Sequence, residues 1–229
     1  MQGQAYARKS GQPLMPQQIK KEFKASDQYS VYPYQPLGSG NIKTGYQSLA
    51  QWIKEQPTLA IDGANGVLWN DVYEGLNDAL TAIGVSVKWI FTHEFFKSEE
   101  DMDQLVTPYL GTPGSVWGTK CEHELADFFE PDLFKKVPQN PDVDCTVVIG
   151  VGAALLEPGA PVIYMDVPKN EIQYRMRAGA VTNLGSSQTV DASAMYKRAY
   201  FVDWPVLNAY KQKLMKRIAV FADVQWPQT

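Results

Sequence analysis

The stretch that most constrains the fold is residues 58–80, with the sequence TLAIDGANGVLWNDVYEGLNDAL. It begins with a short apolar run closed by Asp-Gly, which predicts a strand covered on both faces. A glycine turn follows, and then a segment whose apolar residues recur every three or four positions, which predicts an amphipathic helix. A strand, a glycine turn and a helix in this order open many phosphate-binding α/β domains.

Four further apolar runs predict strands at residues 85–91, 145–150, 161–167 and 217–224. Helical patterns separate most of them. Strands that alternate with helices predict an α/β three-layer sandwich with a mostly parallel five-stranded sheet between two helical layers. In such a sheet the ligand site lies at the carboxyl ends of the strands. Candidate residues are therefore those that follow each strand.

The chain divides into three parts by composition. Residues 1–28 are polar and predict a mobile N-terminal arm. Residues 29–57 predict an extended segment and a short helix packed on the core, and residues 58–225 form the predicted α/β domain.

Charge and composition exclude several classes of protein. Of 229 residues, 21 are basic and 25 acidic, so the net charge of −4 argues against a nucleic-acid or membrane-surface protein. No apolar run approaches the roughly 18 residues of a membrane span, and the N-terminus lacks a signal pattern. A cytoplasmic location is predicted. Two cysteines are too few for a disulfide framework, and Cys145, inside an apolar run, predicts a buried thiol.

The glycine turn departs from the P-loop pattern GxxxxGK[ST]. Counted from Gly63, Leu68 and Trp69 stand where the second glycine and the lysine belong. Without the lysine and the hydroxyl residue, the turn lacks the groups that neutralise phosphate and hold magnesium.

The surroundings of the turn are acidic. Between Leu59 and Val87 there is no Lys or Arg. The same span contains four carboxylates: Asp62, Asp71, Glu74 and Asp78. Gly63, Asn65 and Gly66 are candidate phosphate-binding residues, either in a purely structural turn or in weak anion binding at the helix N-terminus.

A second candidate site follows the strand at 161–167. Lys169, Arg175 and Arg177 lie before a Gly/Ser-rich loop, as expected of an arginine-bearing lid over phosphates. The alternative is a surface pair between Glu171 and Arg175, four residues apart, which leaves Arg177 free.

Other candidates carry weaker signals. Asp166 is either an acid or metal carboxylate or a helix cap. His93 and Glu94 follow the strand at 85–91, where they could act in acid/base chemistry or lie on the surface. Cys121 and His123 lack the further ligands of a zinc site, so no metal site is predicted.

Residues 59–63, the strand region 145–167 and Tyr174 to Arg177 together resemble a uridine-kinase-type P-loop kinase core. The resemblance implies a P-loop kinase-like fold with the first strand entering the phosphate loop and a lid after residue 168. The Walker lysine and Ser/Thr are missing, and no acidic pair follows the second strand. Phosphoryl transfer by the usual route is therefore not expected.

A closer similarity is to the kinase-like N-terminal portion of long bacterial class I mannose-6-phosphate isomerases. The similar stretches are GTPGSVWGT, YMDVPKNEIQYRMRAGAVTNLG and YKRAYFVDWPVLN, within residues 30–225. In that family the isomerase chemistry belongs to a C-terminal cupin domain with zinc. The similarity implies an isomerase domain or subunit as a partner, isomerase activity only if the chain is joined to a cupin, and a chain that is either a fragment or a stand-alone relative.

The sequence thus predicts a degenerate P-loop kinase-like domain that binds a sugar phosphate or nucleotide or supports a mannose-6-phosphate isomerase. No cofactor is required, although weak binding of a nucleotide or Mg²⁺ is compatible with the sequence. The alternative is an active small-molecule kinase, for a nucleoside or a sugar, that uses Lys169, Arg175 and Arg177 in place of the Walker lysine.

Overall fold

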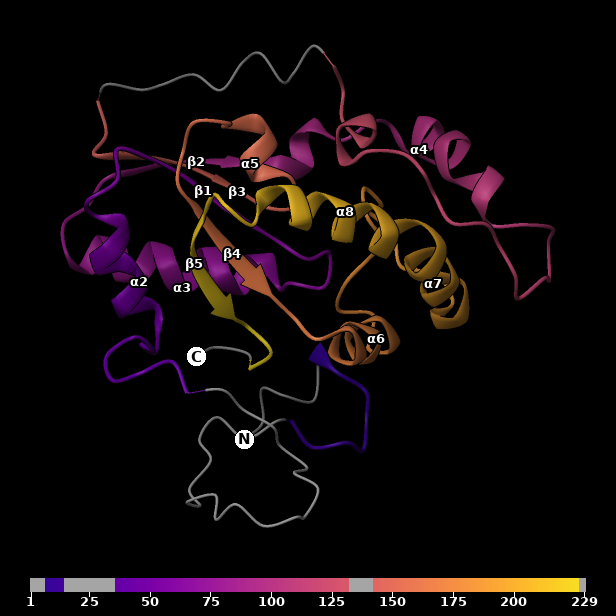
Figure 1. The fold of residues 1–229 in the computed structure, drawn as a ribbon, viewed down its shortest axis with the longest axis horizontal. Coiled ribbons are helices and arrows are strands. Elements are labelled where there is room, and N and C mark those ends of the chain that lie inside the picture. The colour runs from indigo at the N-terminus through magenta and orange to yellow at the C-terminus, as the bar shows by residue number, and fades with distance from the viewer. Residues whose placement is uncertain (1–6, 15–35, 132–141, 227–229) are drawn as a thin grey trace.

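The computed structural model describes residues 7–14, 36–131 and 142–226. Its centre is one five-stranded sheet in the order β2-β3-β1-β4-β5, and every neighbouring pair is parallel. The strands are β1 (Thr58–Gly63), β2 (Val87–Phe91), β3 (Cys145–Ile149), β4 (Val162–Asp166) and β5 (Ile218–Asp223). The predicted α/β architecture with a parallel five-stranded sheet is confirmed (Figure 1).

Helices surround this sheet. They are α2 (Tyr46–Ile53), α3 (Trp69–Ala82), α4 (Glu99–Val106), α5 (Ala153–Leu156), α6 (Lys169–Arg177), α7 (Ala192–Arg198) and α8 (Trp204–Leu214). Short 3-10 turns cover Thr92–Phe95, Thr107–Tyr109 and Leu125–Phe128, and a π-helical turn, Ala199–Asp203, joins α7 to α8.

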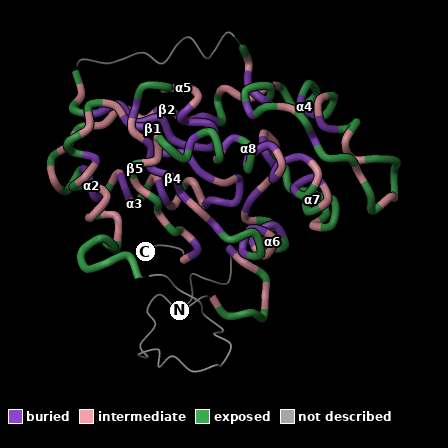
Figure 2. Tube along the Cα trace, in the orientation of Figure 1, coloured by how far each residue is buried: buried purple, intermediate pink, exposed green. Residues whose placement is uncertain are grey.

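Two apolar clusters cover the two faces of the sheet, so the central strands β1, β3 and β4 lie buried between helical layers, whereas the edge strand β5 has no buried residue (Figure 2). On one face α3 presents the predicted stripe, in which Val72, Leu76 and Leu80 are buried, and α2 packs against α3. The ring of Tyr46 from α2 lies so close to α3 that a Cβ on Gly75 would stand 2.2 Å from it. The other face is covered by α4, α5 and α8.

The connection from β3 to β4 passes over β1, which lies between them in the sheet. Its four-residue helix α5 was not predicted, because one turn of helix is too short to show a periodic pattern. Gly150 has φ 124° and lies against Thr92, whose Oγ1 would be 2.1 Å from an added Cβ. This tight crossing places the backbone of residues 150–154 beside the end of β1.

Part of the expected N-terminal arm packs on the domain. Ala7 is fully buried, and the backbone N–H of Lys9 donates to the carbonyl of Tyr174 in α6 at 2.9 Å. Residues 1–6 and 15–35, which include most of the predicted arm and the start of the predicted extended segment, lie outside the described residues.

Across the described ranges, no helix has both the length and the apolar character needed to cross a bilayer. This result agrees with the sequence, which contains no long apolar run.

Cys145 is buried in β3, as predicted, and Cys121 is buried as well. Burial raises the pKa of the Cys145 thiol to about 11 and raises that of Cys121. We therefore expect neither thiol to react with a disulfide reagent such as DTNB in the native protein at pH 8, because the thiolate is the reactive form. Both should react after unfolding in guanidinium. Rapid labelling of one thiol per native chain would contradict this prediction.

Candidate functional site

The turn between β1 and α3 lies at the carboxyl end of the sheet. Gly63 passes directly against β4, where an added Cβ would be 2.4 Å from the carbonyl oxygen of Met165. Three backbone N–H groups near the turn are already paired. Gly63 donates to Asp62 Oδ1 at 2.7 Å, Ala64 to the Met165 carbonyl at 3.2 Å, and Val67 to the Ala64 carbonyl at 3.2 Å. These groups are not free to converge on a phosphate.

Helix α6 packs on this turn. An added Cβ on Gly66 would lie 2.4 Å from Cγ1 of Ile172, so the isoleucine occupies the space next to the glycine. Arg175 donates from Nη1 to the Gly66 carbonyl at 2.8 Å. Its Nη2 donates to the carbonyls of Val224 at 2.8 Å and Gln225 at 3.1 Å, just after β5. The guanidinium therefore joins the turn, α6 and the end of β5.

The expectation of a surface pair between Glu171 and Arg175 is wrong. Both residues are buried, with Arg175 only 1% exposed, and their closest charged atoms are 3.9 Å apart. Burial lowers the pKa of Arg175, and the nearby Glu171 carboxylate opposes that shift. Arg175 is buried because backbone carbonyls from two loops supply acceptors for its donors.

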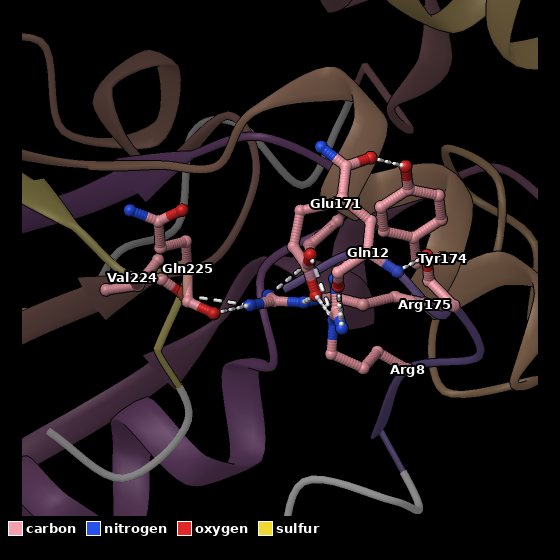
Figure 3. A network of polar contacts seen from close by, with 9 residues as sticks. Arg8, Gln12, Glu171, Tyr174, Arg175, Val224 and Gln225 are labelled. Atoms are coloured by element: carbon pink, nitrogen blue, oxygen red, sulfur yellow. Dashed lines mark hydrogen bonds and ion pairs between the residues drawn. The ribbon is translucent and has the colours of Figure 1, made fainter. Parts of the chain in front are cut away.

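The N-terminal segment completes the surroundings of Glu171 (Figure 3). Arg8 donates from Nε to both Glu171 oxygens, at 2.9 and 3.1 Å, and from Nη1 to the Gln12 carbonyl at 2.8 Å. The Tyr174 hydroxyl donates to Gln12 Oε1, and the Arg8 guanidinium lies 5.1 Å from the centre of the Tyr174 ring. Glu171 thus lies between two arginines, Arg8 and Arg175.

Asp62, at the end of β1, is a buried carboxylate that sequence reasoning counted as part of an acidic turn. Its side chain points to the face of the sheet that α8 covers, away from the face that α3 covers. It accepts from the N–H of Gly152 at 3.0 Å and of Ala154 at 2.9 Å, and from the Tyr210 hydroxyl at 2.5 Å. Burial raises its pKa, and these bonds, with that from Gly63, partly oppose the shift. Asp62 therefore fastens α5 and α8 to β1.

Asn65 takes part in a second buried polar cluster, which sequence reasoning missed. Its Nδ2 donates to Asp203 Oδ2 at 3.2 Å, and the same oxygen accepts from Asn183 Nδ2 at 2.6 Å. Arg198 Nε lies 3.7 Å from Asp203 Oδ1, and burial raises the pKa of Asp203 while Arg198 lowers it. The sequence signal for this burial was the position of Asp203 among aromatic residues, in AYFVDW (199–204). Asn65 thus faces the π-helical turn, where it stabilises the loop.

The remaining candidates at the end of β4 have different surroundings. Lys169 and Arg177 are exposed. Their cationic groups lie 5.3 Å from the Trp204 ring and 5.6 Å from the Tyr174 ring, respectively. Asp166 forms an ion pair with Lys211 at 2.9 Å and does not cap α6.

His93 and Glu94 lie in the exposed 3-10 turn after β2. Strand β3 separates β2 from β1, and no hydrogen bond or ion pair among the described residues joins this pair to the first turn or to α6. In residues 7–14, 36–131 and 142–226, no three His, Cys, Asp or Glu side chains are placed to hold a metal ion.

Two cavities lie near these elements. One, of about 300 Å³, lies between α6 and α7 and includes Arg177 in its lining. The other, of about 380 Å³, lies along α4 and includes Lys97, Asp101 and His123. Of these two cavities, the one between α6 and α7 is lined by a predicted ligand-binding residue, Arg177.

Comparisons with known proteins agree with this fold. A family model described as "Domain of unknown function (DUF8485)" matches residues 45–229. A structure described as "putative fructose transport system kinase from Silicibacter sp. TM1040" matches with a TM-score of 0.50 and 15% identity, covering 81% of this chain and 100% of that one. The fold is therefore P-loop kinase-like.

A second structure, "Possible Uridine Kinase from Bacillus stearothermophilus", matches with a TM-score of 0.48 and 13% identity, covering 78% of this chain and 97% of that one. No curated protein matches the chain.

Proposed function

The chain belongs to the DUF8485 family, and we propose that it is a kinase-fold binding or support module that does not transfer phosphate. One observation carries this proposal: α6 packs on the turn between β1 and α3 and closes it. Ile172 packs on Gly66, and Arg175 donates to the Gly66 carbonyl. A nucleotide phosphate at this turn would have to displace the isoleucine and compete with the bond from Arg175 to the Gly66 carbonyl.

Electrostatics support the same conclusion. Trp69 stands where the lysine of a phosphate loop belongs, and it begins α3. The dipole of α3 is worth about 0.3–1 kcal/mol per exposed charge, which is small for a triphosphate. Asp71, in the first turn of α3, already complements that dipole.

The expected class of ligand is a sugar phosphate or a nucleotide. It follows from the sequence resemblance to P-loop kinases and to mannose-6-phosphate isomerases described above. Lys169 and Arg177 are exposed cations at the two ends of α6 that are not used to close the turn. They are the residues we expect to meet an anionic ligand.

Support of a mannose-6-phosphate isomerase rests on the resemblance of the three sequence stretches quoted above. A coupled isomerase assay on a cupin-containing isomerase, with and without the added chain, would test that link.

The alternative is an active small-molecule kinase with rearranged phosphate contacts. It requires Lys169, Arg175 and Arg177 to replace the Walker lysine. Both terminal nitrogens of Arg175 already donate to backbone carbonyls, which leaves Lys169 and Arg177. If this alternative holds, Arg177→Ala abolishes an ATP-dependent product that the unaltered protein forms.

A direct test compares the unaltered protein with Trp69→Lys. We expect no ATP-dependent product from the unaltered protein with nucleosides or hexoses, and no shift of the Gly66 amide NMR signal on addition of Mg-ATP. Trp69→Lys should likewise show no Mg-ATP-induced shift of the Gly66 amide, because Ile172 still covers Gly66. Product formation by the unaltered protein, or an ATP-induced NMR shift of the Gly66 amide in it, would refute the proposal.

A further inference from the structure

The α6–α7 cavity opens on a face of α6 different from the face that closes the first turn. It has a volume of about 300 Å³ and is lined by Gln173, Met176, Arg177, Ala192, Ser193 and Tyr196. Ile172 and Arg175, which contact Gly66, are not among these residues. A molecule in this cavity would therefore leave the closed turn undisturbed.

Most of the cavity wall is apolar, and two of its side chains pack against neighbouring residues. Met176 is 3% exposed and belongs to the main apolar cluster. Tyr196 packs edge-on against Trp204, with ring centres 5.5 Å apart and planes at 76°. A methionine sulfur and a tyrosine ring are favourable surroundings for an apolar or aromatic group.

Arg177 supplies the positive charge of the cavity. Within the described part of the chain it forms no ion pair with a carboxylate, and its guanidinium lies 5.6 Å from the Tyr174 ring. Along the chain, the acidic residue nearest to the cavity is Asp191, which directly precedes the lining residue Ala192. Its Oδ2 accepts from the Ser193 N–H at 2.9 Å and from the Ser193 hydroxyl, so it is used to cap α7. Gln173 adds an amide that can donate or accept.

We infer that the α6–α7 cavity binds a small organic anion, with its apolar body against Met176 and Tyr196 and its carboxylate or phosphate on Arg177. Ligand cavities have volumes of about 300–1,000 Å³ and combine apolar walls with few polar groups, so this cavity suits a small molecule. Arginine binds carboxylates and phosphates in a bidentate manner. The inference rests on the proposed binding role and adds its site and its class of ligand.

The test uses the whole chain labelled with ¹³C at its methionine methyl groups and follows Met176, whose signal is assigned with Met176→Leu. The probes are phenyl phosphate, benzoate, phenol and inorganic phosphate. We expect phenyl phosphate or benzoate to shift the Met176 signal in a saturable way. Phenol and inorganic phosphate should bind at least about tenfold more weakly, because phenol lacks the anionic group and inorganic phosphate lacks the apolar ring.

Two variants examine the charge and the space separately. Arg177→Gln should weaken binding of the anion about tenfold or more, and Ala192→Leu should block it by filling the cavity while Arg177 remains. Lys54→Gln, which removes an exposed cation just after α2 and outside the cavity, should leave binding unchanged.

An unshifted Met176 signal with both organic anions would overturn the inference. Equal binding of phenol, or equal binding of inorganic phosphate, would overturn it as well. Neither result bears on phosphotransfer, whose detection would instead refute the proposed function. If phenyl phosphate binds and benzoate does not, the inference stands with a phosphate as the recognised group, and the reverse selects a carboxylate.

Discussion

Replacing Arg175 with methionine should lower the free energy of unfolding by about 3–5 kcal/mol, the usual loss when one partner of a buried charged network is removed. The substitution leaves the carbonyls of Gly66, Val224 and Gln225 without their guanidinium donors. Replacing Arg177 with methionine should change the stability by less than about 0.5 kcal/mol, because Arg177 is exposed. Urea unfolding followed by circular dichroism measures both values.

This pair of variants is well matched, since the two arginines lie two residues apart on one helix. Equal effects of the two substitutions would contradict the assignment of Arg175 to closing the turn. A third variant, Arg8→Met, should also destabilise the fold, because it removes the Nε–H donor that the two Glu171 oxygens share. It should have less effect than Arg175→Met, because the backbone carbonyls keep their donors.

Replacing Asp62 with alanine should lower the free energy of unfolding by about 3 kcal/mol or more, because each buried donor left without a partner costs about 1–3 kcal/mol. The carboxylate accepts from three backbone N–H groups and from the Tyr210 hydroxyl. Asp166→Ala is the control, an aspartate at the end of the neighbouring strand with a partly exposed ion pair. Its effect should stay within about 1 kcal/mol. Similar losses from both would contradict the structural role of Asp62.

Asp62 also gives a pH dependence with a defined sign. Burial raises its pKa above the usual 3.8, so between that value and the folded-state pKa the native protein binds more protons than the unfolded chain. Stability from this group is therefore gained as pH falls through the window and lost as pH rises. The stability of the unaltered protein relative to Asp62→Asn should increase as the pH is lowered from 7 toward 4. A difference that shrinks on acidification would contradict this prediction.

The sheet was predictable from sequence because its strands are short apolar runs separated by helical patterns. In β3 every residue is buried, so a continuous run of apolar letters is its expected appearance. The stripe of α3 was equally clear. Alternation along β1 could also have indicated the direction of Asp62. Ala60 belongs to the cluster on the α8 face, and Asp62, two residues later, points to the same face.

The closure of the first turn was not predictable from local patterns. Glu171 and Arg175 have the spacing of an exposed ion pair, and the sequence does not record that two loops supply carbonyls around them. Arg8 lies 163 residues from Glu171 in a polar segment with no periodicity. For Asp203 the only local signal was its position among aromatic residues, since the π-helical turn that contains it has no known sequence pattern. Each miss concerns a polar residue whose burial depends on distant parts of the chain.

The docking of residues 7–14 on α6 makes this segment comparable to a tethered ligand. Its contacts, through Arg8, Lys9 and Gln12, are intramolecular, so they form at an effective concentration that does not change when the protein is diluted. A single cut between residues 14 and 36 would turn this intramolecular contact into a bimolecular one. Occupancy of the α6 surface would then vary with dilution, and a peptide of residues 7–14 would compete for it.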